Sequence, residues 1–329
     1  MTSQPTETYH QSSRRNIGRA SLLCASLALL AGCATAPMAT PGGDISPAAP
    51  TSAVAAPFPS TYTPLPSTTT AIVNASILTA TGNLIENGTI VMDQGTIVAV
   101  GTNVTPPANA TVIDGTGKWV TPGVIDSHSH LGVFPAPGVQ GHADGNDTAH
   151  VWAEHSLWPQ DPVFTKARAG GVTSLLILPG SANLFGGRGV TVKNVPAVTM
   201  QAMKFPDAPY TLKMACGENP KGRYGSRGRA PATRMGNVAG FRRSWIDAGE
   251  YARKWDQYEK KLARGEKADA PKRDLAMETL SGVLKGEILV QNHCYRADEM
   301  AVMMDVASEF GYKIRAFHHA VESYKIAEL

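Results

Sequence analysis

Two histidines one residue apart, His128 and His130, are the residues of this sequence best suited to chemistry. They end a short apolar run that starts at Val124, and Asp126 precedes them at the same spacing. Residues i and i+2 of a β-strand share a face, so we expect the two imidazoles to project together. Two neutral imidazoles at a strand end supply half of a first-row metal site. A strand with two exposed histidines is the alternative, and the pair alone does not decide between them.

Further residues of this kind follow other apolar runs. His293 ends the run 288–293, and His318 and His319 end the run that starts at residue 313. Glu218 follows the run 211–217. Functional residues of a parallel barrel lie at the carboxyl ends of its strands. We therefore expect His293, His319 and Glu218 to join the first pair at one mouth.

A repeated strand–helix pattern after residue 120 has to position these side chains. The expected strands are 124–130, 172–179, 190–194, 211–217, 287–293 and 313–318, and the expected helices are 162–170, 246–264 and 297–310. Short, nearly continuous apolar runs are typical of parallel strands that are covered on both faces. No Gly-x-Gly-x-x-Gly opens a helix after the first strand, which disfavours a dinucleotide-binding sheet. The prediction is an α/β fold, a TIM-type (β/α)8 barrel of which about six strands are counted.

The barrel is predicted to span residues 122–329, and a small N-terminal β domain is predicted for residues 70–121. β-rich runs at 71–78, 88–92 and 96–100 alternate there with turn residues such as Asp93-Gln94-Gly95. This pattern predicts an antiparallel hairpin. Such a short β unit buries little surface alone, so we expect it to pack on the adjoining barrel.

The first 33 residues are predicted to be an export signal. Arg14, Arg15 and Arg19 precede an apolar segment, residues 20–30, that is shorter than the roughly 20 residues of a membrane span. The ending Leu30-Ala31-Gly32-Cys33 resembles a lipoprotein box, which predicts lipid attachment at Cys33. The protein is then lipid-anchored in the bacterial cell envelope, facing the periplasm. The arginine pair also resembles a twin-arginine motif, and general or twin-arginine export stays open.

Residues 34–69 are rich in Ala, Pro, Ser and Thr and predict a disordered tether. The net charge of +3 argues against nucleic acid as a partner. The expected partners are a small-molecule substrate and, through the lipid alone, the membrane; a homo-oligomer stays open. Cys216 and Cys294 could pair, but both lie in expected barrel strands, which favours buried free thiols.

Several motifs together are more specific than any single residue. The segment Gly117–His130, with Gly171-Val172-Thr173 and Gly217-Glu218-Asn219-Pro220-Lys221, resembles the amidohydrolase superfamily, close to its imidazolonepropionase-like and dipeptidase-like branch. The resemblance covers residues 70–329. It implies a (β/α)8 barrel, a small β domain and a centre of one or two divalent metal ions. Zinc is the default, and iron, manganese or cobalt are alternatives.

The resemblance also assigns metal ligands by position. His128 and His130 match the first-strand ligands, His293 matches the fifth and His319 the sixth, with His318 on the opposite face. Glu218 matches a position where relatives place a bridging carboxylate or a carbamylated lysine. Lys213 is the competing candidate for this bridge, and Glu218 is preferred.

The implied activity is hydrolysis of a C–N bond in an amide, dipeptide or cyclic amide by a metal-activated water. A deaminase of a nitrogen heterocycle and a non-catalytic surface lipoprotein with a degenerate barrel are the alternatives. The family places its general base, an aspartate, on an eighth strand, and only six strands are counted here. We therefore expect a C-terminally truncated sequence, and a 329-residue chain that is inactive or unfolded by itself.

Overall fold

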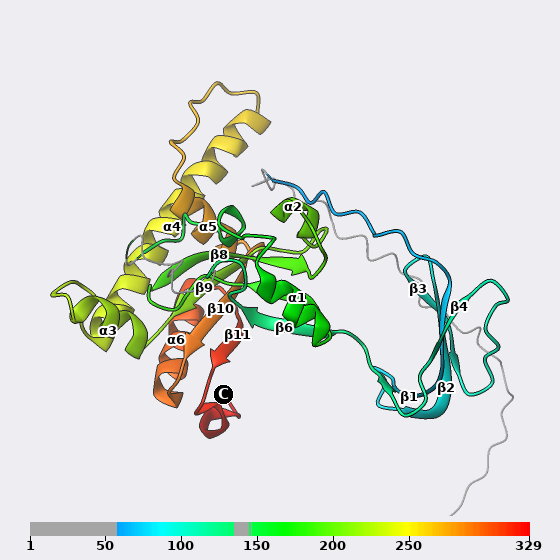
Figure 1. Cartoon of the computed structure of the whole chain (residues 1–329). Coiled ribbons are helices and arrows are strands. Elements are labelled where there is room, and N and C mark those ends of the chain that lie inside the picture. The colour runs from blue at the N-terminus through cyan, green and yellow to red at the C-terminus, as the bar shows by residue number, and fades with distance from the viewer. Residues whose placement is uncertain (1–57, 135–144, 146) are drawn as a thin grey trace, which may run out of the picture. The chain divides into compact units, whose positions relative to one another are not determined.

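The computed structural model describes residues 58–134, 145 and 147–329 (Figure 1). The predicted export signal with Cys33, and the tether as far as residue 57, lie outside these residues. The described part contains a five-stranded sheet, β1 to β5, and a six-stranded sheet, β6 to β11. No helix within this part is long and apolar enough to cross a membrane.

The N-terminal sheet is built around a hairpin. Its strands are β1 (Thr70–Leu78), β2 (Leu84–Asp93), β3 (Thr96–Gly101), β4 (Thr111–Asp114) and β5 (Trp119–Val120). The order is β3-β2-β1-β4, and β5 also pairs with β1. Gln94 and Gly95 connect β2 to β3 with positive φ angles of 47° and 77°. Two positive φ angles suit a tight two-residue hairpin, so the hairpin expected at this turn is confirmed.

The second sheet is a nearly closed, barrel-like layer of six strands. They are β6 (Val124–Ser129), β7 (Val172–Ile177), β8 (Phe185–Lys193), β9 (Thr211–Ala215), β10 (Leu289–Cys294) and β11 (Ile314–His319). Their spatial order, β11-β10-β9-β8-β7-β6, follows the sequence order. β6 is parallel to β7, and β9, β10 and β11 are parallel to one another. This is the barrel-type α/β fold that the sequence predicts.

Strand β8 differs from the prediction because it runs antiparallel to both β7 and β9. Only residues 178–184 lie between β7 and β8. A crossover between parallel strands needs about a dozen residues or more, so this connection forces the chain to turn back. The strand begins earlier than the predicted range 190–194, because the glycine-rich residues 185–189 form its first half.

Helices alternate with several strands of the second sheet along the sequence. They are α1 (Pro162–Ala169), α2 (Met200–Met203), α3 (Glu218–Gly225), α4 (Arg234–Ala263), α5 (Leu275–Leu284) and α6 (Ala297–Phe310), with short 3-10 turns η1 (Ala153–His155) and η2 (Ser323–Ile326). Helix α6 has the predicted bounds and ends at Gly311, whose φ is 73°. Helix α4 begins at Arg234 rather than at Ile246, because the Thr233 side chain caps it by accepting from the Gly236 amide.

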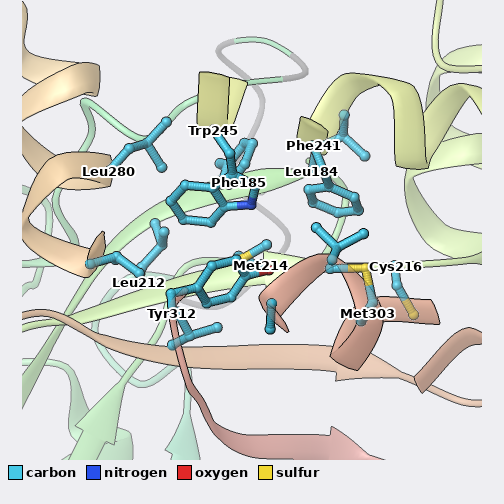
Figure 2. Close-up of a cluster of buried hydrophobic side chains, with 14 of the residues drawn as sticks. Leu184, Phe185, Leu212, Met214, Cys216, Phe241, Trp245, Leu280, Met303 and Tyr312 are labelled. Atoms are coloured by element: carbon cyan, nitrogen blue, oxygen red, sulfur yellow. The ribbon is translucent and has the colours of Figure 1, made fainter. Parts of the chain in front are cut away.

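The core between the sheet and the helices uses the side chains of one face of the strands. The side chains of the other face are therefore available for chemistry. Alternate residues of β9 and β10, among them Leu212, Met214 and Val290, pack with Phe241 and Trp245 of α4 (Figure 2). Successive side chains of a strand point to opposite faces. The residues between them are therefore directed away from α4 and α6.

Cys216 and Cys294 form a disulfide, with Cα atoms 5.3 Å apart. Cys294 ends β10, and the amide of Cys216, just after β9, donates to the His293 carbonyl. The two cysteines thus lie at the carboxyl ends of neighbouring strands. The prediction of free thiols is wrong, because the sequence does not show that these two strand ends are adjacent.

Candidate metal centre

Four predicted histidines meet on the face of the sheet opposite the helices. The His128 ring centre lies 5.0 Å from that of His130 and 5.1 Å from that of His319. The His319 ring centre lies 4.5 Å from that of His293. Residues from β6, β10 and β11, far apart in the sequence, thus form one cluster.

His318 also belongs to this cluster, contrary to the prediction that it points away. Its ring centre lies 4.4 Å from that of His128. Adjacent residues of an extended strand cannot share a face, but His319 has a φ of 65°. This left-handed backbone turns the last side chain of β11 back toward the cluster. Both histidines of the His318-His319 pair consequently lie against His128.

Lys213, and not Glu218, lies with the histidines. The Lys213 side chain, in the middle of β9, is 0% exposed, and its Nζ lies 3.2 Å from His128 Nε2. The Glu218 side chain begins α3 and is 54% exposed. Its carboxylate binds Lys221 at 3.3 Å and Arg234 at 3.0 Å. Of the two candidates for the bridging position, Lys213 lies within the histidine cluster and Glu218 lies outside it.

Burial keeps the imidazoles neutral. Desolvation, assisted by the nearby Lys213 charge, lowers the pKa of His128 to about 2. Desolvation and the neighbouring His319 lower the pKa of His293 to about 3, and desolvation and Lys213 lower that of His318 to about 4. The neutral imidazole is the form that binds metal ions.

Lys213 is an amine in an unusual environment. Desolvation lowers its pKa to about 7. Within the described part of the chain no carboxylate forms an ion pair with it, although a buried lysine is normally paired. A large fraction of this amine is therefore neutral and nucleophilic near neutral pH.

Hydrogen bonds orient the rings and the strand that carries them. His130 Nδ1 lies 2.7 Å from the Leu178 carbonyl oxygen, which can only accept, so Nδ1 carries the proton. This leaves a lone pair on Nε2, as in histidines that bind metals through that nitrogen. His318 Nε2 donates in the same way to Gln291 Oε1 at 2.7 Å. The Asp126 carboxylate accepts from the His128 amide at 3.1 Å.

The donor set fits a divalent metal, although the side chains do not converge on one point. His293 is 1% exposed, and neither ring nitrogen has a hydrogen-bond partner among the described residues. Leaving a buried polar atom unpaired costs about 1–3 kcal/mol, which binding of an ion would offset. The rings pack edge to face, and no three His, Cys, Asp or Glu side chains of the described ranges form a ready metal site.

Comparisons with known proteins find similar amidohydrolases. No family model matches the sequence. The chain is 38% identical over 240 residues to the amidohydrolase tasK of Hapsidospora irregularis, across 68% of this chain and 24% of that protein. It is 33% identical over 111 residues to a 5-methylthioadenosine/S-adenosylhomocysteine deaminase of Bacillus cereus, across 32% of this chain and 24% of that enzyme. The matches thus span about a quarter of these curated relatives.

A solved structure extends the similarity to the fold. The crystal structure of an amidohydrolase from Thermotoga maritima MSB8 superposes with a TM-score of 0.69 at 35% sequence identity. The superposition covers 78% of this chain and 66% of that one.

Proposed function

The chain belongs to the amidohydrolase superfamily, and on this premise we propose that it is a metal-dependent hydrolase of a C–N bond in an amide, a dipeptide or a cyclic amide. The cluster of neutral, buried imidazoles around Lys213 supports this proposal most strongly. Such a group of side chains has no evident structural purpose, because it places the unpaired nitrogens of His293, and an amine that no carboxylate of the described residues neutralises, in the protein interior.

His128, His130, His293 and His319 would hold the ion, with zinc as the default choice. When bound, such an ion lowers the pKa of a coordinated water toward about 7 and polarises the carbonyl that is to be cleaved. The protein's own contribution is orientation. The Leu178 carbonyl holds His130 in the tautomer with a free Nε2, and Asp126 fixes the backbone at His128.

Lys213 is our candidate for the bridging position, in place of Glu218. Its neutral Nζ can attack carbon dioxide, which forms an N–C bond and releases one proton. The resulting carbamate carries two oxygens and a negative charge into the histidine cluster. The low pKa of Lys213 supports this assignment because only the unprotonated amine reacts.

Metal content decides between the two candidates without relying on turnover. We expect the purified protein to bind one or two equivalents of zinc by mass spectrometry, and His293→Ala and Lys213→Ala to lose most of it. Glu218→Ala is the matched control and should retain the metal. Full zinc content in Lys213→Ala, or its loss in Glu218→Ala, would contradict the Lys213 assignment. Retained stoichiometric zinc in a His128→Ala, His293→Ala double variant would overturn the metal site itself.

Deamination of a nitrogen heterocycle is the second candidate, supported by the match to the Bacillus cereus deaminase. The two reactions release different products. A panel of dipeptides and cyclic amides should yield new amino groups, whereas 5-methylthioadenosine would yield ammonia and a shift in its ultraviolet absorption. Ammonia release from the nucleoside, with no cleavage in the amide panel, would favour the deaminase.

The cellular location proposed from the sequence is the periplasmic side of a bacterial membrane, with Cys33 as the lipid-bearing residue. The Cys216–Cys294 disulfide supports export, because disulfides persist mainly in oxidising compartments. A small molecule remains the expected substrate, and a homo-oligomer remains open.

A further inference from the structure

His318 and Gln291 form a buried hydrogen-bonded pair beside the candidate ligands. His318 lies in β11, and Gln291 lies in the neighbouring strand β10, two residues before His293. Their exposed fractions are only 8% and 6%. His318 Nε2 lies 2.7 Å from Gln291 Oε1, and because that oxygen can only accept, Nε2 carries the proton. The nitrogen at the tip of the His318 ring is therefore already engaged by the protein.

This engagement distinguishes His318 from histidines that we assign to the ion. Both ring nitrogens of His293 lack a hydrogen-bond partner among the described residues. His130 donates from Nδ1 to a backbone carbonyl and so keeps the lone pair of its Nε2. In His318 the Nε2 lone pair is absent, and a role as ligand would have to use Nδ1, beside the attachment of the ring to Cβ.

The His318 ring packs against the candidate ligand His128. Their ring centres lie 4.4 Å apart and their planes form an angle of 86°, which is an edge-to-face contact. The His128 ring centre is farther from those of His130, at 5.0 Å, and His319, at 5.1 Å. A ring at this short distance restricts rotation of the His128 imidazole.

The contact between His128 and His318 also joins two strands that do not pair. β6 and β11 are the first and last strands in the order of the sheet, and within the described residues no backbone ladder connects them. Side chains must therefore set the distance between the ligands of β6 and those of β10 and β11. His318, held on β10 through Gln291 and in contact with His128 on β6, makes such a connection.

We propose that His318 is a positioning residue and not a metal ligand: held by Gln291, it orients the His128 imidazole toward the ion. This inference rests on the proposed metal-dependent function. Loss of a group that orients a metal-binding histidine typically weakens metal binding by about 10- to 100-fold. Gln291 acts on His128 only through His318, so removal of either side chain should have the same effect.

Zinc affinity, measured on the folded protein by competition with a chromogenic chelator, tests this connection. Gln291→Ala and His318→Ala should keep the zinc stoichiometry of the original protein and bind zinc about 10- to 100-fold more weakly. The double variant should bind no more weakly than either single variant, because the two side chains act as one unit. Gln291→Glu should bind at least as tightly as the original, since a carboxylate also accepts from Nε2. Additive losses, or weaker binding by Gln291→Glu, would overturn the connection.

His318→Phe separates positioning from ligation. Phenylalanine keeps a ring beside His128 but has no nitrogen. We expect this variant to retain the full zinc stoichiometry, and its cobalt-substituted form to keep the visible spectrum of the original, which reports the ligands of the ion. A lower stoichiometry or a changed spectrum would identify His318 as a ligand and overturn the inference. His319→Ala, at the adjacent assigned ligand, should lose zinc. Gln257→Ala, at an exposed residue of α4, is the matched control and should bind zinc like the original.

Failure of the proposed function gives a different result from failure of this inference. If the original protein binds no stoichiometric zinc, the metal-dependent function is wrong and the role of His318 is wrong with it. If the original and Gln257→Ala bind zinc but His318→Phe does not, the metal site stands and only the positioning role is wrong.

Discussion

Lys213 is the side chain of the candidate site whose surroundings suit its charged form least. It lies in the middle of a fully buried strand, among imidazoles that are themselves neutral, and its hydrogen-bond partner is His128. A protonated ammonium is poorly solvated there, which explains the fall of its pKa to about 7. Burial of this amine lowers the stability of the folded protein, and it also makes the amine reactive.

Replacing this amine with an apolar chain of similar length should stabilise the metal-free protein. The pKa of Lys213 is about 7 in the folded state and about 10.4 in an unfolded chain. Between these values the unfolded chain binds more protons, so the original protein gains stability as pH rises. We expect Lys213→Met to gain about 2 kcal/mol or more at pH 6, and progressively less toward pH 10. Urea unfolding with a chelator at pH 6 and pH 9.5 measures this.

A lysine on the surface provides the control for that experiment. Lys254 is exposed on α4, and Lys254→Met should change stability little and equally at both pH values. An equal gain in stability from Lys213→Met at pH 6 and pH 9.5 would show that burial does not lower the pKa of Lys213.

Among single residues, the sequence predicted those whose role in the site follows from their position at the end of a strand. His128, His130, His293 and His319 were identified because each ends an apolar run. Glu218 also follows such a run, but Gly217, with a φ of 64°, turns the chain away from the cluster. Strand alternation could have indicated Gln291, two residues before His293. The turned backbone at His319, which brings its side chain to the same face as that of His318, leaves no signal in the sequence.

The position of strand β8 depends on a close approach to the backbone of a neighbouring segment. Gly187 lies where β8 runs beside residues 148–152, and its φ is 115°. A Cβ there would lie 2.4 Å from the Val151 carbonyl oxygen. Only glycine adopts this conformation without strain and permits this approach.

We expect Gly187→Ala to lower the free energy of unfolding by about 3 kcal/mol, because both the backbone conformation and the close contact are violated. Gly222→Ala is the matched control, since a Cβ in α3 at this position meets nothing within 4 Å. Alanine favours a helix, so this variant should gain about 0.5–1 kcal/mol. Urea unfolding measures both. A Gly187→Ala protein as stable as the original would mean that β8 relaxes freely.

Apolar runs predicted the elements better than they predicted their directions. All six strand positions of the second sheet were anticipated, and α6 had the predicted bounds, because strong periodicity identifies an element's type. The direction of β8 depends on the short connection at 178–184, whose end was misplaced because the strand was predicted to begin only at residue 190. The first turns of α4 contain Gly236 and Gly240, which weaken a helix signal.

The Cys216–Cys294 disulfide acts at the scale of the whole molecule because it joins residues 78 positions apart. A cross-link over a loop of this length restricts the unfolded chain and typically contributes about 2–4 kcal/mol. We expect a Cys216→Ala, Cys294→Ala double variant to lose this amount in urea unfolding. Dithiothreitol should reduce the stability of the original protein to a similar level and leave the double variant unchanged. Equal sensitivity of both proteins to the reductant would contradict the cross-link.

The connection between the predicted tether and the folded protein is held at a defined point. The Phe58 carbonyl accepts from Lys204 Nζ at 2.8 Å, and Ser60 Oγ donates to the Lys204 carbonyl at 2.6 Å. The Lys204 ammonium also binds the Glu154 carboxylate at 2.7 Å. Residues 58–60, assigned to the tether from the sequence, are therefore attached to the unit that contains α2.

The predicted anchor at Cys33 determines whether that attachment carries the protein on a membrane. We expect the protein, expressed in a bacterium with lipoprotein processing, to sediment with membranes after a carbonate wash and to incorporate labelled palmitate. Cys33→Ser should abolish the label and release the protein into the soluble periplasmic fraction, because two or more acyl chains are needed for stable anchoring. Cys24→Ser, in the preceding apolar segment, is the matched control and should remain membrane-bound and labelled. Labelled, membrane-bound Cys33→Ser protein would contradict the lipoprotein prediction, whereas unlabelled protein in both variants and the original would indicate a cleaved signal without lipid.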